Sequence, residues 1–252
     1  MFRALVTLFY ASLVVGLVTL VAVVSPFRRT TGGFADSSIY LWARGILLLA
    51  GVRVIVEGER LPPIGRPSFF VGNHQSAMDI PVLLYVLSAR ARFMAKDSLF
   101  RVPVFGYLIR RFGFVPVDRR NVRKTHESVD AMLQFLRRNP VSIVVFPEGT
   151  RSVEGKLLPF RKGALKICQR AGLGVVPFAI SGSAAVHRRG RFRIDPGVVR
   201  VRFAPLIPET EVNAMSVGAL HDRVYKAVDA ALAVMTVRGP DAASFASSTE
   251  AV

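Results

Sequence analysis

Cysteine is almost absent from this chain of 252 residues, which contains only Cys168. A single cysteine cannot form an intrachain disulfide, and it excludes metal sites built from clustered thiolates. Cys168 lies in the apolar stretch 164–168, where a buried structural thiol is expected rather than a nucleophile. No pair of histidines has the spacing that holds a zinc ion. We therefore expect neither a metal nor a cofactor.

Signatures of several other functional classes are missing as well. No G-x-S-x-G nucleophile elbow occurs, which disfavours a serine hydrolase. Gly149 and Lys156 miss the spacing of a Walker A loop by one residue, so no nucleotide-binding loop is predicted. No helix-turn-helix, zinc-finger or aromatic RNA-binding pattern is found, so nucleic acid is not the expected partner.

Acidic residues are scarce relative to basic ones. The chain has 17 Asp and Glu against 34 Lys and Arg, which gives a formal net charge of +17. Such an excess indicates an anionic partner, for example a phospholipid surface, a phosphorylated substrate or an acidic carrier protein. Basic residues gather between residues 90 and 124 and again between 188 and 202. As groups they fit a membrane surface, although most such charges in proteins simply face solvent.

Long apolar runs, in contrast, are present. Residues 4–24 carry no charge and are long enough to cross a bilayer core as a helix. The run is longer than the apolar region of a signal peptide and lacks a good cleavage site, which favours a retained anchor. Residues 39–50 are apolar but short and contain Arg44, so an interfacial helix and an ordinary core helix both remain open. The basic excess beyond residue 25 places the main domain on the cytoplasmic side.

From residue 52 onward, short apolar runs alternate with helical patterns. This alternation predicts an α/β fold, with a central, mostly parallel sheet flanked by helices. We predict a membrane anchor and interfacial helix over residues 1–51, a globular domain over 52–237 and a disordered tail over 238–252. Strands are expected at 52–58, 69–72, 112–117, 141–146, 175–180 and 198–203, and helices at 80–87, 122–138, 162–170 and 213–235.

The most informative polar stretch is Asn73-His74-x-x-x-x-Asp79, between an apolar strand and an apolar helix. Side chains five residues apart do not share one face of a continuous helix, so His74 must precede the helix and Asp79 must lie in its first turn. Asp79 could then accept a hydrogen bond from one imidazole nitrogen and leave the other as a base. Alternatively, Ser76-x-x-Asp79 fits a capping box, with His74 a polar turn residue.

A second polar turn, Phe146-Pro147-Glu148-Gly149-Thr150-Arg151-Ser152, follows the strand at 141–146 and reaches the same sheet edge as His74. Its backbone N–H groups, hydroxyl and guanidinium could bind an anion. An ordinary polar β-turn with a surface arginine fits equally well. Arg119, at the end of another strand, and Lys96, in a turn after 93–95, could each contact a phosphate or face solvent.

Four blocks in this order resemble the glycerophosphate acyltransferase superfamily, most closely its bacterial 1-acyl-sn-glycerol-3-phosphate acyltransferases. They are Asn73-His74-x-x-x-x-Asp79, the stretch 113–119, the stretch 146–152 and Val176-Pro177-Phe178. The resemblance covers residues 52–203 and an apolar N-terminus typical of the family. It makes the catalytic interpretation of His74 and Asp79 stronger than the capping interpretation.

The resemblance implies a membrane-bound enzyme with an acyltransferase domain over residues 52–237. Such an enzyme moves an acyl chain from acyl-CoA or acyl carrier protein to the sn-2 hydroxyl of 1-acyl-glycerol-3-phosphate, giving phosphatidic acid. His74 would be the base and Asp79 its orienting partner. The glycerol phosphate would contact Glu148, Gly149, Thr150 and Arg151, with Arg119 and Lys96 as further phosphate contacts. Another lysolipid acceptor, such as a lyso-ornithine lipid, and a non-enzymatic basic membrane-binding protein remain the alternatives.

Overall fold

The computed structural model describes residues 1–24, 33–62, 66–117, 122–139, 141–152, 156–188 and 190–237. Within α5 (Val122–Arg138), side chains are described from Glu127 onward. Two sequence predictions lie outside the described residues, namely the tail over 238–252 and the phosphate contact Arg119.

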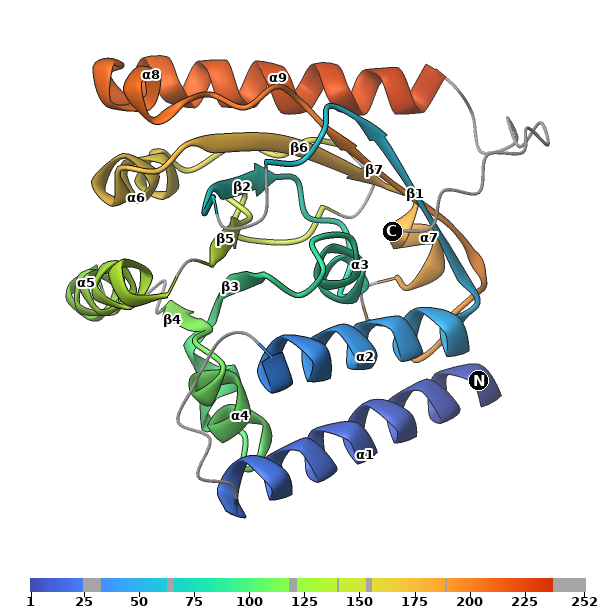
Figure 1. Ribbon diagram of the computed structural model, residues 1–252. Coiled ribbons are helices and arrows are strands. Elements are labelled where there is room, and N and C mark those ends of the chain that lie inside the picture. Colours follow the sequence, from blue (N-terminus) through green and yellow to red (C-terminus); the bar gives the residue numbers. More distant parts are fainter. Residues whose placement is uncertain are drawn as a thin grey trace.

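A seven-stranded sheet forms the centre of the molecule, in the order β1-β7-β6-β2-β5-β3-β4 (Figure 1). Neighbouring strands are parallel, except that β7 runs antiparallel to β6. The predicted α/β fold with a mostly parallel sheet is therefore confirmed. The strands are β1 (Val52–Gly58), β2 (Phe69–Gly72), β3 (Ala91–Lys96), β4 (Val115–Val117), β5 (Ser142–Val145), β6 (Val175–Ser181) and β7 (Gly197–Phe203).

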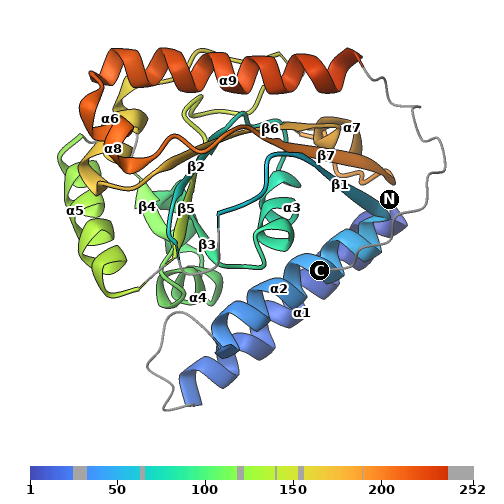
Figure 2. The ribbon, with the colours of Figure 1, turned by 45° about the horizontal axis from the view of Figure 1, so that its top comes forward.

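Helices cover both faces of the sheet, so the central strands contribute side chains to two cores. In β6, Val176, Phe178 and Ile180 pack with α2 and α3, whereas Val175 and Ala179 pack with α6 and α9. A strand buried on both faces is apolar throughout, which explains its continuous apolar sequence. Figure 2 shows α9 on one side of the sheet and α1 and α2 on the other. The covering helices are α2 (Gly33–Ala50), α3 (Asp79–Val86), α6 (Lys162–Ala171) and α9 (Val217–Val237).

The N-terminal helix α1 (Phe2–Val24) packs against the outer side of α2 (Figure 1). Among the described helices, only α1 is long and apolar enough to cross a membrane. Its outward apolar side chains are largely uncovered, and exposed apolar surface of this extent marks a membrane or protein interface. They include Leu5, Leu8, Phe9, Leu13, Leu17 and Leu20. In α2, Ala43 and Leu47 lie in the core whereas Leu41 and Leu48 are exposed, so this helix is both a core helix and an outward apolar surface.

Three elements differ from those predicted. The helix α2 begins at Gly33, before the apolar run at 39–50 in which a helix was expected. The strand β3, whose apolar pattern is interrupted by Arg92, was not predicted; its last residue, Lys96, directly precedes the 3-10 turn at Asp97–Arg101. The predicted helix over 213–235 is divided into α8 (Glu209–Ala214) and α9. The division arises at Ser216, whose Oγ accepts a hydrogen bond from the N–H of Ala219 and begins a new helix.

The strand expected at 112–117 is shorter than predicted, because its first residues form the turn that ends a helix. The chain contains η1 (Asp97–Arg101) and α4 (Phe105–Arg111) before β4 begins at Val115. Gly113 has a φ of +79°, a conformation that glycine adopts without steric cost and that ends the helix. The apolar residues in the turn that follows α4 therefore had the same sequence pattern as the start of a strand.

A buried arginine joins the α2 helix to the sheet. Arg92 is completely inaccessible, and its Nη2 lies 2.7 Å from Oδ1 of Asp36 in the first turn of α2. The same guanidinium donates to the carbonyl groups of Ala89, Ala91 and Phe112. Because the carboxylate compensates a charge held away from water, this contact fixes α2 relative to β3.

We expect Asp36→Ala to lower the free energy of unfolding by about 3 kcal/mol, because it removes the charge that compensates a buried guanidinium. Denaturant unfolding in detergent measures this loss. The matched control is Asp97→Ala, since Arg101 in that ion pair is 70% exposed. The control should cost no more than about 0.5 kcal/mol. Equal losses in the two variants would contradict the anchoring role.

Candidate active site

The turn after β2 is held in place by Asn73. Its side-chain amide donates to the carbonyl of Ile180 at 2.9 Å, and its Oδ1 accepts from the N–H of Ile180 at 2.7 Å. Asn73 is almost completely buried, so both polar atoms of its amide need these partners. The two bonds continue the β2–β6 ladder through a side chain, which lets the backbone leave the sheet at His74.

His74 and Asp79 contact each other directly. Asp79 is the first residue of α3, and its Oδ2 lies 2.7 Å from Nδ1 of His74. The same oxygen accepts hydrogen bonds from the N–H groups of Gln75 and Ser76 at 2.7 and 3.0 Å. Asp79 therefore satisfies backbone donors before the helix and also contacts the imidazole. The expected contact between Asp79 and the imidazole is present, and Met78, not Ser76, is the residue before the first turn of α3.

The His74 ring is fixed from two further directions. It stacks on Phe146, with ring centroids 4.1 Å apart and an angle of 11° between the planes. Its backbone carbonyl accepts a hydrogen bond from the N–H of Ser152 at 2.8 Å. Among the described residues, Nε2 of His74 has no hydrogen-bond partner, and the side chain is 14% exposed. An imidazole whose Nδ1–H is held by a carboxylate presents Nε2 as a proton acceptor.

The second turn lies beside the first, because β5 is the parallel neighbour of β2. Gly149 has a φ of +71°, and a Cβ at this position would come within 2.9 Å of Arg161. The N–H of Gly149 donates to the carbonyl of Phe146, which closes the turn. Thr150 is exposed and Arg151 is half-buried at the same sheet edge. The bond between Ser152 and His74 joins the two turns into one site.

Glu148 lies in the interior of this site. Its Oε1 accepts from the N–H of Leu158 at 3.4 Å, and its Oε2 is buried without a hydrogen-bond partner. Burial raises the pKa of Glu148 to about 7, against the opposing effect of backbone N–H groups of Leu158 and His74; the negative charge of Asp79 raises it further. A neutral carboxyl at this position can donate a hydrogen bond, which a carboxylate cannot.

This pKa predicts a pH-dependent effect of Glu148→Gln. As pH rises from 5 toward 7, the unfolded chain has released the Glu148 proton while the folded protein still holds it, so stability falls. The glutamine variant does not titrate, so its Tm should rise relative to that of the wild type between pH 5 and pH 8. Thermal unfolding at both pH values tests this, with the exposed Glu209→Gln as the control. A difference independent of pH would contradict a neutral Glu148.

The remaining predicted site residue, Lys96, ends β3 and is exposed. It lies at the same carboxyl edge of the sheet as the two turns, because β3 pairs in parallel with β5. No described residue cluster of three or more His, Cys, Asp or Glu could hold a metal ion. Cys168 is fully buried on α6, where burial raises its pKa, in agreement with the structural thiol expected.

Sequence reasoning missed several residues that shape the site. Asn73 belongs to the first motif but was given no role of its own, and its bonds to Ile180 span 107 positions of the chain. The hydroxyl of Ser76 donates to the carbonyl of His187 at 2.7 Å, which brings α7 (Ser183–Val186) against the His74 turn. Phe146 was assigned to a strand, yet it stacks on the imidazole. No local pattern signals these contacts, because each joins distant segments.

The family model for acyltransferases matches residues 53–181, just over half of the chain, including both turns. This chain belongs to the acyltransferase family. The resemblance inferred from the motifs is thereby confirmed. The matched range 53–181 includes β2, β5 and β6 and the sequence positions of all the predicted site residues.

Named relatives extend this acyltransferase match. The chain is 34% identical over 178 residues to chloroplastic 1-acyl-sn-glycerol-3-phosphate acyltransferase LPAT1 of Arabidopsis thaliana, covering 70% of this chain and 48% of that protein. It is 32% identical over 179 residues to 1-acyl-sn-glycerol-3-phosphate acyltransferase alpha of Homo sapiens, covering 71% of this chain and 63% of that protein. The chain thus spans about half the length of the plant relatives it matches.

A solved structure is similar over nearly the whole chain. It is the 1-acyl-sn-glycerophosphate (LPA) acyltransferase PlsC of Thermotoga maritima, which is 28% identical with a TM-score of 0.81. The similarity covers 94% of this chain and 96% of that chain, and so includes the helices α1 and α2. The whole fold, and not only the acyltransferase domain, is therefore shared.

Proposed function

We propose that this protein transfers a fatty acyl chain from a thioester to the sn-2 hydroxyl of 1-acyl-glycerol-3-phosphate, giving phosphatidic acid for phospholipid synthesis. The observation that carries the proposal is the His74–Asp79 contact, joined through Ser152 to the turn that bears Arg151. The names of the relatives from Arabidopsis thaliana, Homo sapiens and Thermotoga maritima support this choice of acceptor.

The reaction needs no nucleophile from the protein, because the acceptor supplies its own hydroxyl. Nε2 of His74 takes the hydroxyl proton as the oxygen forms a bond to the thioester carbonyl carbon. Asp79 holds Nδ1–H and stabilises the imidazolium that results. When the tetrahedral intermediate collapses, the C–S bond breaks and the thiolate takes the proton from His74. The imidazole then returns to its starting state.

The acceptor phosphate is assigned to the second turn. Arg151 can form charge-assisted hydrogen bonds to phosphate oxygens, Thr150 carries a hydroxyl, and Gly149, which has no side chain, lets a phosphate approach the backbone of the turn. Glu148, in its neutral form, can donate to a glycerol oxygen. Lys96, and Arg119 outside the described residues, would add positive charge at the same sheet edge.

The apolar helix α1 supports a membrane location, where both the acceptor and the product reside. Exposure of its leucine side chains to water is unfavourable, and its apolar composition is compatible with the hydrocarbon core of a membrane. The net charge of +17 favours an anionic membrane surface. We place the catalytic domain on the cytoplasmic side, where acyl-CoA and acyl carrier protein are available.

The experiment is a transfer assay in detergent or vesicles with labelled acyl-CoA or acyl carrier protein and a panel of lysolipids. Rapid transfer to 1-acyl-glycerol-3-phosphate is expected, with little transfer to acceptors that lack a free phosphate. Preference for a phosphate-free lysolipid, such as a lyso-ornithine lipid, would overturn the acceptor assignment. Failure of the folded protein to acylate any lysolipid would overturn the enzymatic function.

Arg151→Ala should raise KM for 1-acyl-glycerol-3-phosphate by about 10- to 100-fold, because one charge-assisted hydrogen bond is worth about 1.5–3 kcal/mol. Arg151→Lys should recover part of the loss, since an ammonium keeps the charge but not the two-pronged geometry. Steady-state kinetics with varied acceptor measure both. Arg170→Ala, which removes an exposed ion pair with Asp130, is the control and should leave KM unchanged. An unchanged KM in Arg151→Ala would show that the acceptor phosphate does not bind to Arg151.

A further inference from the structure

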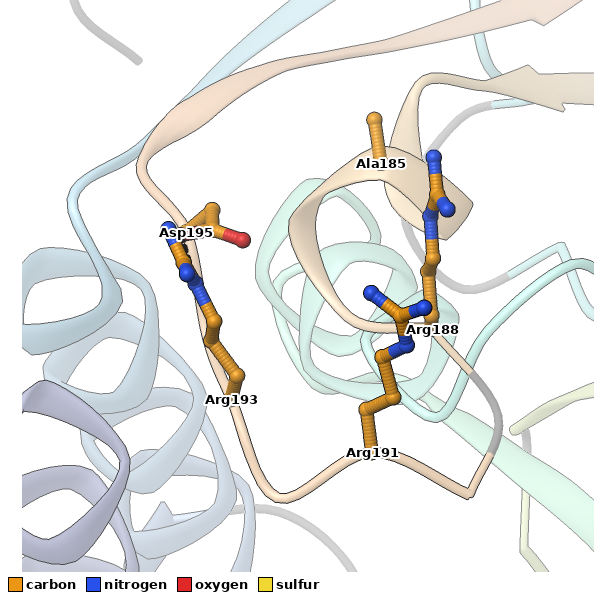
Figure 3. Close-up of a pocket in the computed structure, with 5 residues that line it drawn as sticks. All are labelled: Ala185, Arg188, Arg191, Arg193 and Asp195. Carbon is orange, nitrogen blue, oxygen red and sulfur yellow. Dashed lines mark hydrogen bonds and ion pairs between the residues drawn. The ribbon is translucent and has the colours of Figure 1, made fainter. Parts of the chain in front are cut away.

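A pocket separate from the His74–Asp79 pair lies between α7 and the segment that leads into β7. Its volume is about 320 Å³, and it is lined by Ala185, Arg188, Arg191, Arg193 and Asp195. Figure 3 shows Arg188 and Arg191 on one side of the hollow and the Arg193–Asp195 pair on the other. Pockets for small molecules have volumes of roughly 300–1,000 Å³, so this hollow suits a compact group.

The pocket carries a surplus of positive charge. Nε of Arg193 lies 2.7 Å from Oδ1 of Asp195, so this carboxylate already compensates one arginine. Arg188 and Arg191 have no acidic partner among the described residues, and both are exposed. Arginines elsewhere in this basic stretch are different, because Arg200 and Arg202 both contact Glu57. Two uncompensated guanidinium groups in a concave site favour a ligand with phosphate groups.

A short chain of contacts connects the pocket to the catalytic turn. His187 directly precedes Arg188, and its backbone carbonyl accepts the hydrogen bond from Ser76 Oγ. Burial, together with the positive charge of Arg151, lowers the pKa of His187. Arg151, in the second turn of the proposed active site, is therefore close enough to His187 for its charge to affect the ionisation of that residue. The pocket and the proposed acceptor site are neighbours, but they share no lining residue.

We infer that this pocket binds the phosphate groups of coenzyme A in an acyl-CoA donor. The inference rests on the proposed thioester transfer. The acceptor phosphate is assigned to Arg151, whereas coenzyme A carries several phosphate groups at the far end of its pantetheine arm. When the thioester of such a donor lies at His74, the negatively charged phosphate groups of its coenzyme A lie some distance from the catalytic residues. A concave basic site near the catalytic turn, but not at it, matches that requirement in charge and in shape.

The test compares two donors, acyl-CoA and acyl-pantetheine, of which the second keeps the thioester and the pantetheine arm but lacks the phosphorylated adenosine part of coenzyme A. With the acceptor saturating, Arg188→Ala/Arg191→Ala should raise KM for acyl-CoA by at least about tenfold, because two charge-assisted hydrogen bonds are lost. KM for acyl-pantetheine and KM for the acceptor should not change. The control is Arg137→Ala/Arg138→Ala, which removes the same charge from exposed positions on α5 at the opposite side of the molecule (Figure 1).

Direct binding separates this inference from the proposed function. Titration of the whole 252-residue chain with coenzyme A alone, by calorimetry, should give a Kd that the double variant weakens to a similar extent. That result supports the pocket even if the protein acylates a different lysolipid. An unchanged Kd for coenzyme A overturns the inference. So does a selective loss of binding to anionic vesicles, or of activity with acyl carrier protein, since the arginines would then contact a membrane or a carrier.

Discussion

Replacing His74 with alanine is expected to lower kcat/KM by about 10²–10⁴-fold, the usual contribution of a positioned general base. The acceptor hydroxyl then has to lose its proton without an acceptor at Nε2, and the thiolate leaves without a proton donor. Lipid binding should be retained, because α1 and the basic surface are unchanged. Initial rates with acyl-CoA and 1-acyl-glycerol-3-phosphate, together with vesicle binding, measure both properties.

A second histidine–aspartate pair provides the control for this experiment. His221 Nδ1 lies 2.8 Å from Oδ1 of Asp222, and its Nε2 contacts the carbonyl of Phe160. The pair belongs to α9 and therefore cannot reach the substrates at the β2 turn. His221→Ala should retain the transfer rate. If His74→Ala, correctly folded, also retained it, the proposed role of His74 would be wrong.

Asp79→Asn is expected to lower kcat by about 10²–10⁴-fold while leaving the turn folded. The N–H groups of Gln75 and Ser76 both point at Oδ2, so an amide nitrogen at this position would face two donors. The amide oxygen should therefore take the place of Oδ2 and still accept from His74 Nδ1. The imidazole keeps its tautomer and loses only the negative charge that stabilises the imidazolium.

Asp79→Ala extends this test, because it also removes the acceptor for both backbone N–H groups. It should lower Tm as well as kcat, since unsatisfied buried donors cost about 1–3 kcal/mol each. Rates and thermal unfolding of both variants distinguish the two effects. Asp222→Asn, at the exposed pair on α9, is the matched control and should change neither. If Asp79→Asn kept full activity, the carboxylate would serve only the helix and not the reaction.

Local sequence patterns predicted much of the fold, and the misses have physical causes. The apolar run at 69–72 became β2, which is buried on both faces and is therefore apolar throughout, and the alternating run at 52–58 became the edge strand β1, whose residues are half-buried or exposed. The strand β3 was missed because Arg92, a charged residue, occupies a core position. Its contacts with Asp36 and three carbonyl groups compensate the buried charge.

By itself, the sequence determined the family, the α/β class and the pairing of His74 with Asp79, since a strand, a turn and a helix leave a five-residue spacing little freedom. Tertiary structure alone decided which other groups surround that pair. Phe146 under the imidazole, Ser152 on its backbone and the Arg188–Arg191 pocket beside Ser76 all come from segments far apart in the chain. Parallel strands have their carboxyl ends at one edge of the sheet. The order of the strands, which is a property of the whole sheet, determines which loops lie next to the His74 turn at that edge.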